Sequence, residues 1–420
     1  MKIQRVKIDG FKNLNNVDIS FDRLTAIVSL NNLGKSNYLK GINFGISFIK
    51  ANNSSKILML SSKNSMPFNK SNFGKNFCFE IETKTNIDNQ NYITLYSFEA
   101  KWNYKNDNEP IIVSESLKIK KDEAHQKYTT VIDRNLSECT YKSSPQSRCT
   151  TKLKLDGLEL AINKLKAYDQ LFYIDIIKKL NSISLYMEDT LDARSMYDQN
   201  PILIKDVGNV MFMVQNLPKV LFKLKENNRD KYELIESTFI SLFPNIEELN
   251  VTEVKINTSD VKFQDDSTVS ISDSVYLLSV KDKNLVTTLS FEEMSDGAKR
   301  ILVLLTRIIL AEISNVSLIA VEEPENSIHP SLLNSYIQVI SGLLDDSKLI
   351  FTSHSPYIIS YLSNESIYVG LSDGQGGANF KHVNMKPLIR DAKEVDMLTG
   401  DYLFSLIADE SELIDDYLED

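Results

Sequence analysis

Cysteine, histidine and tryptophan are scarce in this chain. Its 420 residues include three cysteines, four histidines and one tryptophan. No two cysteines stand at the short spacing that a zinc site or a small disulfide framework requires. This pattern argues against a disulfide-stapled domain and a cysteine-based zinc module, and we expect reduced thiols at Cys78, Cys139 and Cys149.

Long hydrophobic runs are also missing. The longest candidate covers residues 301–313 and is broken by Thr306, Arg307 and Glu312, so it does not have the length or the apolar character of a membrane span. Residues 1–13 alternate charged and apolar positions, which is typical of a strand and not of a signal peptide. We therefore expect a cytoplasmic protein with no membrane partner.

The composition is that of a globular protein whose charge is unevenly spread. Hydrophobic residues make up 42% and charged residues 25% of the chain, which is enough to bury a sizeable core and to form more than one subdomain. The net charge of −10 argues against a broad nucleic-acid coat. Residues 409–420 carry seven acidic side chains and no basic one, as in a solvated surface or a tail for a protein partner.

The middle of the chain is richer in basic residues. Two interpretations are open: an ordinary solvated surface, or a basic face for DNA, RNA or an acidic partner. The residues concerned are Lys142, Arg148, Lys152, Lys154, Lys164, Lys166, Lys178 and Lys179.

Hydrophobic periodicity predicts an α/β protein in several parts. Residues 24–30 are a nearly continuous β-branched run, and residues 316–321 and 348–352 are also mostly apolar, as is typical of buried strands in a mostly parallel sheet. We expect residues 1–50 and 285–400 to form the core around this sheet. An antiparallel β lobe is predicted for 51–155, inserted helices for 156–250, strands returning to the core for 251–284, and an acidic C-terminal tail for 401–420.

A glycine-lysine-serine element follows the first buried strand and precedes an apolar helical pattern. In a phosphate-binding loop, backbone N–H groups and the helix N-terminus hold the anion, a lysine reaches it and a hydroxyl binds Mg²⁺. Lys35 and Ser36 fill the last two roles, although Ser29 replaces the usual first glycine and Leu33 is bulky for such a turn. A chance match stays open for this stretch alone. The predicted nucleotide-binding residues are Asn31, Asn32, Leu33, Gly34, Lys35, Ser36 and Asn37.

Paired carboxylates end the second buried strand. Strands of an open α/β sheet deliver side chains to its carboxyl edge, where ligands bind. Glu322 is the candidate Mg²⁺ ligand with Ser36, and Glu323 would orient or deprotonate an attacking water. His354 follows the third buried strand and would touch the γ-phosphate or that water. Exposed glutamates and a surface histidine are the structural alternatives.

A Ser-x-Gly element opens the helix before the second strand. Ser295, Asp296 and Gly297 would place a helix N-terminus near a γ-phosphate bound by another subunit. Alone, the same residues are more often an ordinary helix cap. Taken with the loop and the carboxylates, the element predicts a composite nucleotide site.

Together these motifs resemble the ABC-type ATPases of the OLD and RecF/SMC group. The resemblance rests on residues 31–37, 294–297, 322–325 with His329 and Pro330, and 353–356, and on a similar N-terminal hairpin over residues 3–21 that includes the stretch 10–14. It covers roughly residues 1–50 and 285–370. The family implies an ABC-type P-loop ATPase head that uses ATP and Mg²⁺ and forms homo-oligomers; a glutamate pair at 322 and 323 looks like an OLD-type trait.

The family also implies a partner. OLD nucleases carry a C-terminal Toprim domain, and the roughly 65 residues after His354 are too few for one, so we expect any nuclease to be a separate polypeptide. Stand-alone ATPases of anti-phage systems such as Septu and PARIS are similar. Three functions remain open at this stage: an ATPase that controls an effector, a nucleotide-binding scaffold with little turnover, and a DNA repair ATPase that contacts DNA through the basic middle.

Overall fold

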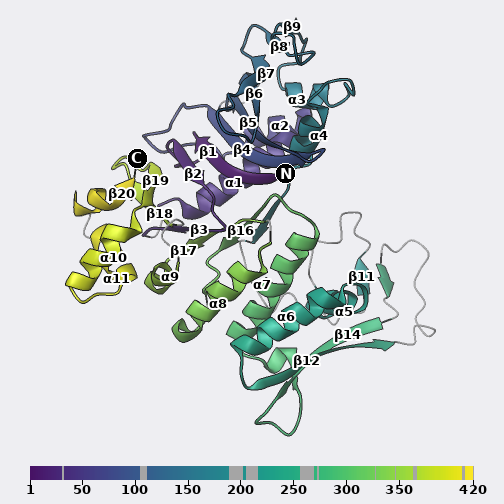
Figure 1. Cartoon of the computed structure of the whole chain (residues 1–420), viewed down its shortest axis with the longest axis vertical. Helices are drawn as coiled ribbons and strands as arrows, with labels where there is room; N and C mark the ends of the chain where they lie inside the picture. The colour runs from purple at the N-terminus through teal and green to yellow at the C-terminus, as the bar shows by residue number, and fades with distance from the viewer. Residues whose placement is uncertain are drawn as a thin grey trace. The chain divides into compact units, whose positions relative to one another are not determined.

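The chain folds into two compact units. In the computed structural model, unit 1 comprises Met1–Glu188, Val316–Glu323 and Asp346–Asp420, and unit 2 comprises Asp189–Asn315 and Pro324–Asp345 (Figure 1). The structure describes residues 1–30, 33–104, 111–188, 202–204, 216–255, 269–271, 274–326, 328–345, 347–362, 367–408 and 412–419.

The core sheet of unit 1 has seven strands, and its first five run parallel. Its order is β10-β16-β17-β3-β18-β19-β20, with antiparallel pairing only for the last two strands. The predicted buried strands at 24–30, 316–321 and 348–352 are its centre. The bounds are β3 Leu24–Val28, β10 Leu185–Glu188, β16 Leu318–Glu322, β17 Leu349–Ser353, β18 Ile367–Ser372, β19 Ala378–Val383 and β20 Leu418–Glu419.

The second sheet of unit 1 has eight antiparallel strands and forms the predicted β lobe. Its order is β2-β1-β4-β5-β6-β7-β8-β9, so the N-terminal hairpin pairs with the lobe through β1 and β4. The bounds are β1 Lys2–Asp9, β2 Val17–Ser20, β4 Phe77–Ile87, β5 Gln90–Ala100, β6 Ile112–Lys121, β7 Thr129–Arg134, β8 Cys139–Tyr141 and β9 Thr151–Lys152.

Helix α1 (Lys35–Lys50) shares one hydrophobic core with both sheets of unit 1. Its buried residues, among them Leu39, Ile42 and Phe48, belong to the same cluster as residues of either sheet. A Cβ atom at Gly45 would lie 2.3 Å from the ring of Phe79, so only glycine allows α1 to approach β4 this closely. The remaining helices are α2 Asn53–Leu60, α3 Ala161–Leu165, α4 Ile174–Asn181, α9 Pro356–Tyr361, α10 Met385–Glu394, α11 Thr399–Ala408 and the 3₁₀ helix η2 Glu412–Tyr417.

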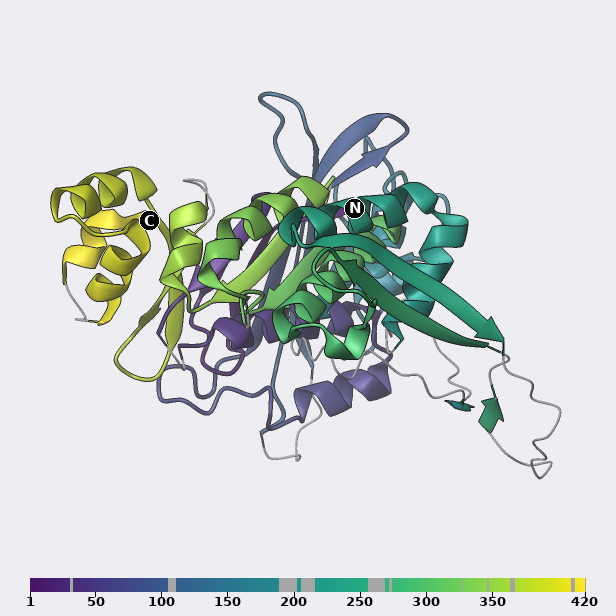
Figure 2. The ribbon, with the colours of Figure 1, turned by 90° about the horizontal axis from the view of Figure 1, so that it is seen from below.

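Unit 2 combines helices with a three-stranded antiparallel sheet of order β12-β14-β15, whose two long strands are seen side by side in Figure 2. Capping defines its helices: the side chain of Asn216 accepts from Lys219 N–H at the start of α5, and that of Ser295 from Ala298 N–H at the start of α7. The bounds are α5 Leu217–Asn227, α6 Arg229–Leu242, α7 Asp296–Ile313, α8 Pro330–Leu343, the 3₁₀ helix η1 Phe291–Glu293, β11 Ile202–Ile204, β12 Ile246–Lys255, β13 Val269–Ile271, β14 Ser274–Asp282 and β15 Leu289–Ser290.

The structure differs from the predicted boundaries in three places. Strand β10 lies within the predicted insertion but pairs with β16 as an edge strand of the core sheet. The predicted inserted helices are divided, α3 and α4 belonging to unit 1 and α5 and α6 to unit 2. Residues 251–284 do not return to the core sheet, because β12 and β14 form a sheet within unit 2.

The predicted acidic tail is folded over its described part. Helix α11 continues to Ala408, η2 follows, and β20 pairs with β19 in the core sheet. The side chain of His382 lies 2.7 Å from that of Glu419 across this pair. The acidic residues therefore do not prevent the C-terminal segment from joining the core sheet. Strand β20 pairs through the backbone of only two residues, at the edge of the sheet.

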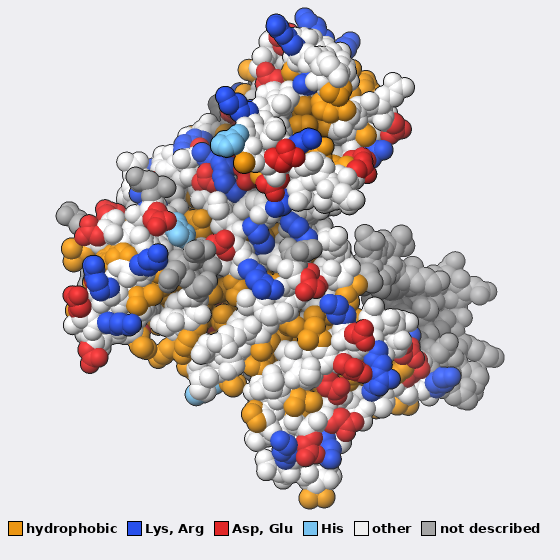
Figure 3. Space-filling view, viewed as in Figure 1, with side chains coloured by type: hydrophobic (Ala, Val, Ile, Leu, Met, Phe, Trp, Pro, Cys, Tyr) orange, Lys and Arg blue, Asp and Glu red, His pale blue; other side chains and the backbone are white. Residues whose placement is uncertain are grey.

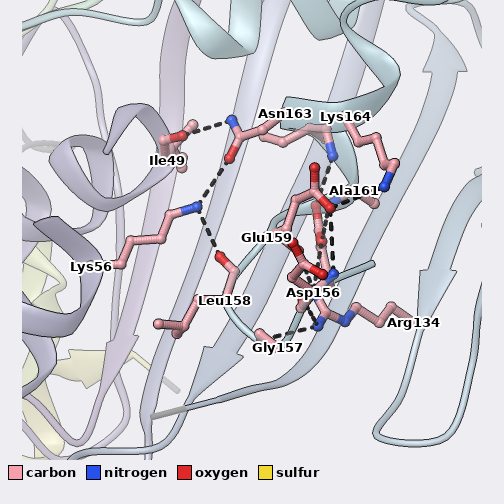
Figure 4. Close-up of polar contacts among 12 residues, drawn as sticks. Ile49, Lys56, Arg134, Asp156, Gly157, Leu158, Glu159, Ala161, Asn163 and Lys164 are labelled. Atoms are coloured by element: carbon pink, nitrogen blue, oxygen red, sulfur yellow. Dashed lines mark hydrogen bonds and ion pairs between the residues drawn. The ribbon is translucent and has the colours of Figure 1, made fainter. Parts of the chain in front are cut away.

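A buried polar network joins α2, the β lobe and the turn before α3 (Figure 4). Lys56 Nζ donates to Leu158 O and Asn163 Oδ1, each at 3.1 Å. Arg134 donates to the carbonyls of Asp156, Gly157 and Glu159 at 2.6–3.3 Å. We call Lys56, Glu115, Arg134 and Asn163, with the turn 156–162, the lobe network.

Candidate functional site

The loop before α1 depends on a glycine in a left-handed conformation. Gly34 has φ +90°, and a Cβ atom there would lie 2.9 Å from the side-chain oxygen of Asn13 and 3.1 Å from Cβ of Ala378. No other residue type fits this space without strain. Gly34 is also the N-cap residue of α1, so the helix N-terminus is open at the loop. Of the predicted residues, Asn31 and Asn32 lie outside the described part of the chain; Leu33 is half-buried.

Lys35 is buried and its ammonium group is held at the loop. Nζ donates to Ser29 O at 2.9 Å, to Ser29 Oγ at 3.0 Å and to Leu30 O at 3.1 Å. The same nitrogen lies 3.3 Å from Nδ1 of His354. These contacts concentrate a positive charge where β3 ends and α1 begins, as an anion site requires.

Ser36 and Glu322 meet although 286 residues separate them. Ser36 Oγ donates to Glu322 Oε2 at 3.1 Å, and Lys40 Nζ lies 4.0 Å from Glu322 Oε1. A hydroxyl and a carboxylate side by side provide the oxygen ligands that Mg²⁺ prefers. These residues therefore fit the Mg²⁺ that a P-loop ATPase uses. Among the described residues, no cluster of three or more His, Cys, Asp or Glu forms a larger metal site.

Glu323 is held in an unusual backbone conformation at the end of β16. Its φ is +46°, rare for a residue with a long side chain. Its N–H donates to Thr352 O at 3.1 Å and is 3.3 Å from Thr352 Oγ1, so neighbouring β17 fixes this turn. Strain of this kind is often retained at functional sites because it aims a side chain.

His354 lies between the lysine and the second glutamate. Its Nε2 is 3.2 Å from Glu323 Oε1, while Nδ1 faces Lys35. Partial burial, and then the positive charge of Lys35, lower the pKa of His354 below its ordinary 6.5, against an opposing effect of Glu323. A lowered pKa favours the neutral imidazole at neutral pH. In that form, one ring nitrogen can donate a hydrogen bond and the other can accept one. We call Lys35, Ser36, Glu322, Glu323 and His354 the nucleotide cluster.

Several contact residues escaped the sequence analysis. Thr352 holds Glu323, and Lys40, one turn after Ser36 on α1, approaches Glu322. Asn13 accepts from the side chain of predicted Asn37 at 2.8 Å and also borders Gly34. The position of Thr352 at the end of a predicted buried strand could have indicated that it lies near the site. The contacts of Asn13 could not have been predicted, because no sequence spacing relates the N-terminal hairpin to α1.

The structure does not bring the Ser-x-Gly element into the unit of the nucleotide cluster. Ser295, Asp296 and Gly297 belong to unit 2, whereas the five cluster residues belong to unit 1. Ser295 Oγ accepts from Ala298 N–H at 3.3 Å, and Asp296 lies 3.6 Å from Lys299 Nζ. Locally, this element is a helix cap.

No described helix is both long enough and apolar enough to cross a membrane.

Comparison with known proteins gives one family and several structures. Residues 216–360 match the family described as "AAA domain, putative AbiEii toxin, Type IV TA system". No curated protein matches. Among solved structures, an SMC head bound to the C-terminal winged-helix domain of ScpA is 12% identical to this chain, with a TM-score of 0.46. The alignment covers 93% of this chain and 100% of the SMC head chain.

Two further SMC heads are similar. The SMC head domain from Thermotoga maritima is 11% identical, with a TM-score of 0.43. The alignment covers 91% of this chain and 99% of that structure. The head from Pyrococcus furiosus, with an extended coiled coil and the C-terminal domain of ScpA, has 12% identity, coverage of 94% and 99%, and a TM-score of 0.43. The family match covers Ser295–Gly297, Glu322, Glu323 and His354 but not Lys35. Residues 216–360 therefore resemble an AAA domain, and the described core sheet is a mostly parallel α/β sheet.

Proposed function

We propose that this chain binds and hydrolyses ATP and uses the cycle to control a partner protein. The observation that carries the proposal is the nucleotide cluster: at the start of α1, Ser36 donates to Glu322 from the end of β16, and the neighbouring Lys35 lies beside His354. Two motifs from opposite ends of the chain thus supply a cation, a hydroxyl and a carboxylate at one sheet edge. Phosphoryl transfer needs these groups.

Each residue of the cluster receives a role in this proposal. Lys35 exchanges its carbonyl contacts for phosphate oxygens at the N-terminus of α1, where the helix dipole also favours an anion. Ser36 and Glu322 hold Mg²⁺, which neutralises phosphate charge when bound. Glu323 orients the attacking water and accepts its proton, and neutral His354 hydrogen-bonds that water or the γ-phosphate.

A complete site in the proposal needs a second copy of the chain. Ser295, Asp296 and Gly297 present the N-terminus of an 18-residue helix from unit 2, and we assign them to the γ-phosphate held by the other copy. ATP then promotes dimer or higher homo-oligomer formation, and hydrolysis reverses it. This cycle gives the chain a switch for an effector.

For the effector, we propose a separate nuclease in a cytoplasmic anti-phage defence system. The matching family is described as "AAA domain, putative AbiEii toxin, Type IV TA system", and this printed association of an AAA domain with a toxin–antitoxin system is what motivates the defence role in the proposal.

A DNA-contacting repair ATPase is the second candidate, and the structure provides weaker support for it. Several lysines of the basic middle are engaged within the lobe: Lys152 with Glu138, Lys164 with Glu159, and Lys178 with Asp169. Figure 3 shows basic side chains interspersed with acidic ones over the lobe face in view. A mixed surface of this kind favours no strong phosphate contact.

The test compares ATP turnover of the wild type with that of Glu323→Gln. We expect at least about a hundredfold slower turnover in the variant, because the amide cannot accept the proton of the water. ATP should still bind and should shift Glu323→Gln toward a larger species in analytical ultracentrifugation. Glu325→Gln, two residues further along the chain, is the matched control and should retain turnover. Equal background rates for the wild type and Glu323→Gln would instead support the scaffold with little turnover.

A further inference from the structure

A pocket lies beside the Ser-x-Gly element within unit 2. Its volume is about 330 Å³, near the lower end of the roughly 300–1,000 Å³ of ligand pockets. This volume suits one or two bulky apolar side chains. The lining comes from α6 and the turn after it, the three-stranded sheet, the first turn of α7 and α8. We call it the signature pocket; its residues are Leu242, Phe243, Pro244, Asn245, Ile246, Val280, Asp282, Leu289, Met294, Ser295, Ala298 and Leu332.

The wall of the signature pocket is apolar apart from three side chains, Asn245, Asp282 and Ser295. Ser295 is the residue whose hydroxyl caps α7. A molecule in the pocket would therefore contact the Ser-x-Gly element directly, on the same unit and without crossing to the nucleotide cluster.

Apolar surface continues from the pocket onto the turn between β14 and β15. Both flanking residues of this turn, Asp282 and Leu289, line the pocket. Within the turn, Leu285 is 46% exposed and Val286 is fully exposed. Two adjacent apolar side chains in water beside an apolar pocket are typical of a surface that another protein covers.

The charge around the pocket is negative. Residues 242–248 and 280–299 carry six carboxylates and three lysines. Each lysine contacts a group of unit 2: Lys281 pairs with Glu247 at 2.9 Å, Lys283 donates to Pro244 O at 2.7 Å, and Lys299 donates to Glu292 O at 2.8 Å. The surroundings therefore favour a positively charged partner.

We propose that the signature pocket is a docking site for a partner polypeptide that inserts a bulky apolar side chain flanked by basic residues. The apolar side chain of the partner packs against Leu242, Val280 and Met294 inside the pocket. A basic residue next to it in the partner's sequence pairs with Asp282. A second copy of this chain would bring a net charge of −10 to this acidic surface, so the proposal gives the pocket to a basic partner and leaves only the N-terminus of α7 to the γ-phosphate of the other copy. The proposal specifies where the effector of the proposed function binds, and so rests on it for the biological role.

The experiment titrates the full-length protein, without nucleotide, with acetyl-Arg-Trp-Arg-amide. The Met294 methyl resonance of methyl-labelled protein is the reporter, assigned with Met294→Leu. We expect a saturable shift, and little or none with acetyl-Arg-Ala-Arg-amide, which lacks the anchor, or with acetyl-Glu-Trp-Glu-amide, which reverses the charge. Since no ATP is present, a negative result would overturn the docking proposal without affecting the proposed ATP hydrolysis. Likewise, a failure to detect ATP hydrolysis would leave this peptide test unaffected.

Two variants locate the binding. Asp282→Lys should weaken the Arg-Trp-Arg peptide about tenfold, and Leu332→Trp should abolish binding by filling the pocket. Asp230→Lys, an exposed residue of α6 with the same charge change, should bind as the wild type does, and thermal melting of each variant checks folding. No shift at Met294, equal binding of the Glu-Trp-Glu peptide, or an unchanged affinity in Asp282→Lys would each overturn the proposal.

Discussion

Unit 1 buries two lysines for different reasons. Lys35 is 5% exposed and Lys56 is 1% exposed, and both donate to backbone carbonyl oxygens. The partners of Lys56 are internal: Leu158 O, Asn163 Oδ1 and, at 5.4 Å, the ring of Phe48. Lys35 instead lies beside His354, whose other ring nitrogen is 3.2 Å from Glu323 Oε1. Lys56 links α2 to the turn before α3, whereas the proposed function gives Lys35 an anion to bind.

The pKa of Lys56 shows what its burial costs. Burial lowers this pKa from 10.5 to about 8, although the carboxylates of Glu115 and Glu159 raise it in part. The lowered pKa means that the hydrogen bonds and nearby carboxylates do not fully replace the hydration that this cation loses, so its burial is weak evidence of net stabilisation. The comparison teaches that burial of a lysine alone does not indicate a phosphate site; the neighbouring open helix N-terminus does.

The largest expected effect on the lobe side of the comparison is that of Glu115→Gln. Glu115 is fully buried and accepts from Ala161 N–H at 2.6 Å, Ile162 N–H at 3.1 Å and the hydroxyl of Tyr96 at 3.0 Å. Arg134 lies 3.8 Å away. Removing the carboxylate leaves a buried guanidinium without its counter-charge and turns an amide group toward backbone donors. We expect a loss of about 3–5 kcal/mol in the free energy of unfolding.

Urea denaturation at pH 7 measures this loss. Glu123→Gln changes an exposed residue of the same lobe and serves as the control; its unfolding free energy should match the wild type. If Glu115→Gln were as stable as Glu123→Gln, the lobe network would not be the stabilising element described above.

A smaller effect is expected in the pH dependence of stability. The unfolded chain holds the Lys56 proton up to about pH 10.5, whereas the folded chain releases it near pH 8. Between these values the unfolded state binds more protons, so this residue makes the unfolding free energy rise with pH, by at most about 1.4 kcal/mol per pH unit. Lys56→Met should lack this rise.

Denaturation of both proteins between pH 7.5 and 10 tests the difference in slope. Lys63→Met, an exposed lysine just after α2, should keep the wild-type slope. Parallel curves for the wild type and Lys56→Met would mean that Lys56 titrates like a surface lysine.

The sequence predicted the central strands, and which motif residues lie close together, better than it predicted the edges and the lobe network; the nucleotide role of those residues stays a prediction. The sequences of strands β3, β16 and β17 are mostly apolar, although β16 ends in Glu322 and β17 in Thr352 and Ser353, and nearly all their residues are buried. Strand β10 has only four residues and an alternating burial pattern, so it resembled the surrounding insertion. Strand β20 has two residues in an acidic segment and carried no strand signal at all.

The polar residues divide in the same way. Lys35, Ser36 and Glu322 could be predicted because fixed spacings in known phosphate sites relate them to a loop or a strand end. The partners of the lobe network have no such spacing: Lys56 and Leu158 are 102 residues apart, and Glu115 and Ala161 are 46 apart. Only the paired strands β6 and β7 bring Glu115 opposite Arg134.

The most direct test of the central claim is the affinity of Mg²⁺–ATP for Lys35→Met compared with Lys56→Met, measured by titration calorimetry. Lys35→Met should bind about a hundredfold more weakly than the wild type, because it loses the cation that reaches the phosphates. Lys56→Met should retain wild-type affinity, since its ammonium group faces the lobe interior. Equal affinities for the two variants, or undiminished binding by Lys35→Met, would contradict the assignment of the nucleotide cluster.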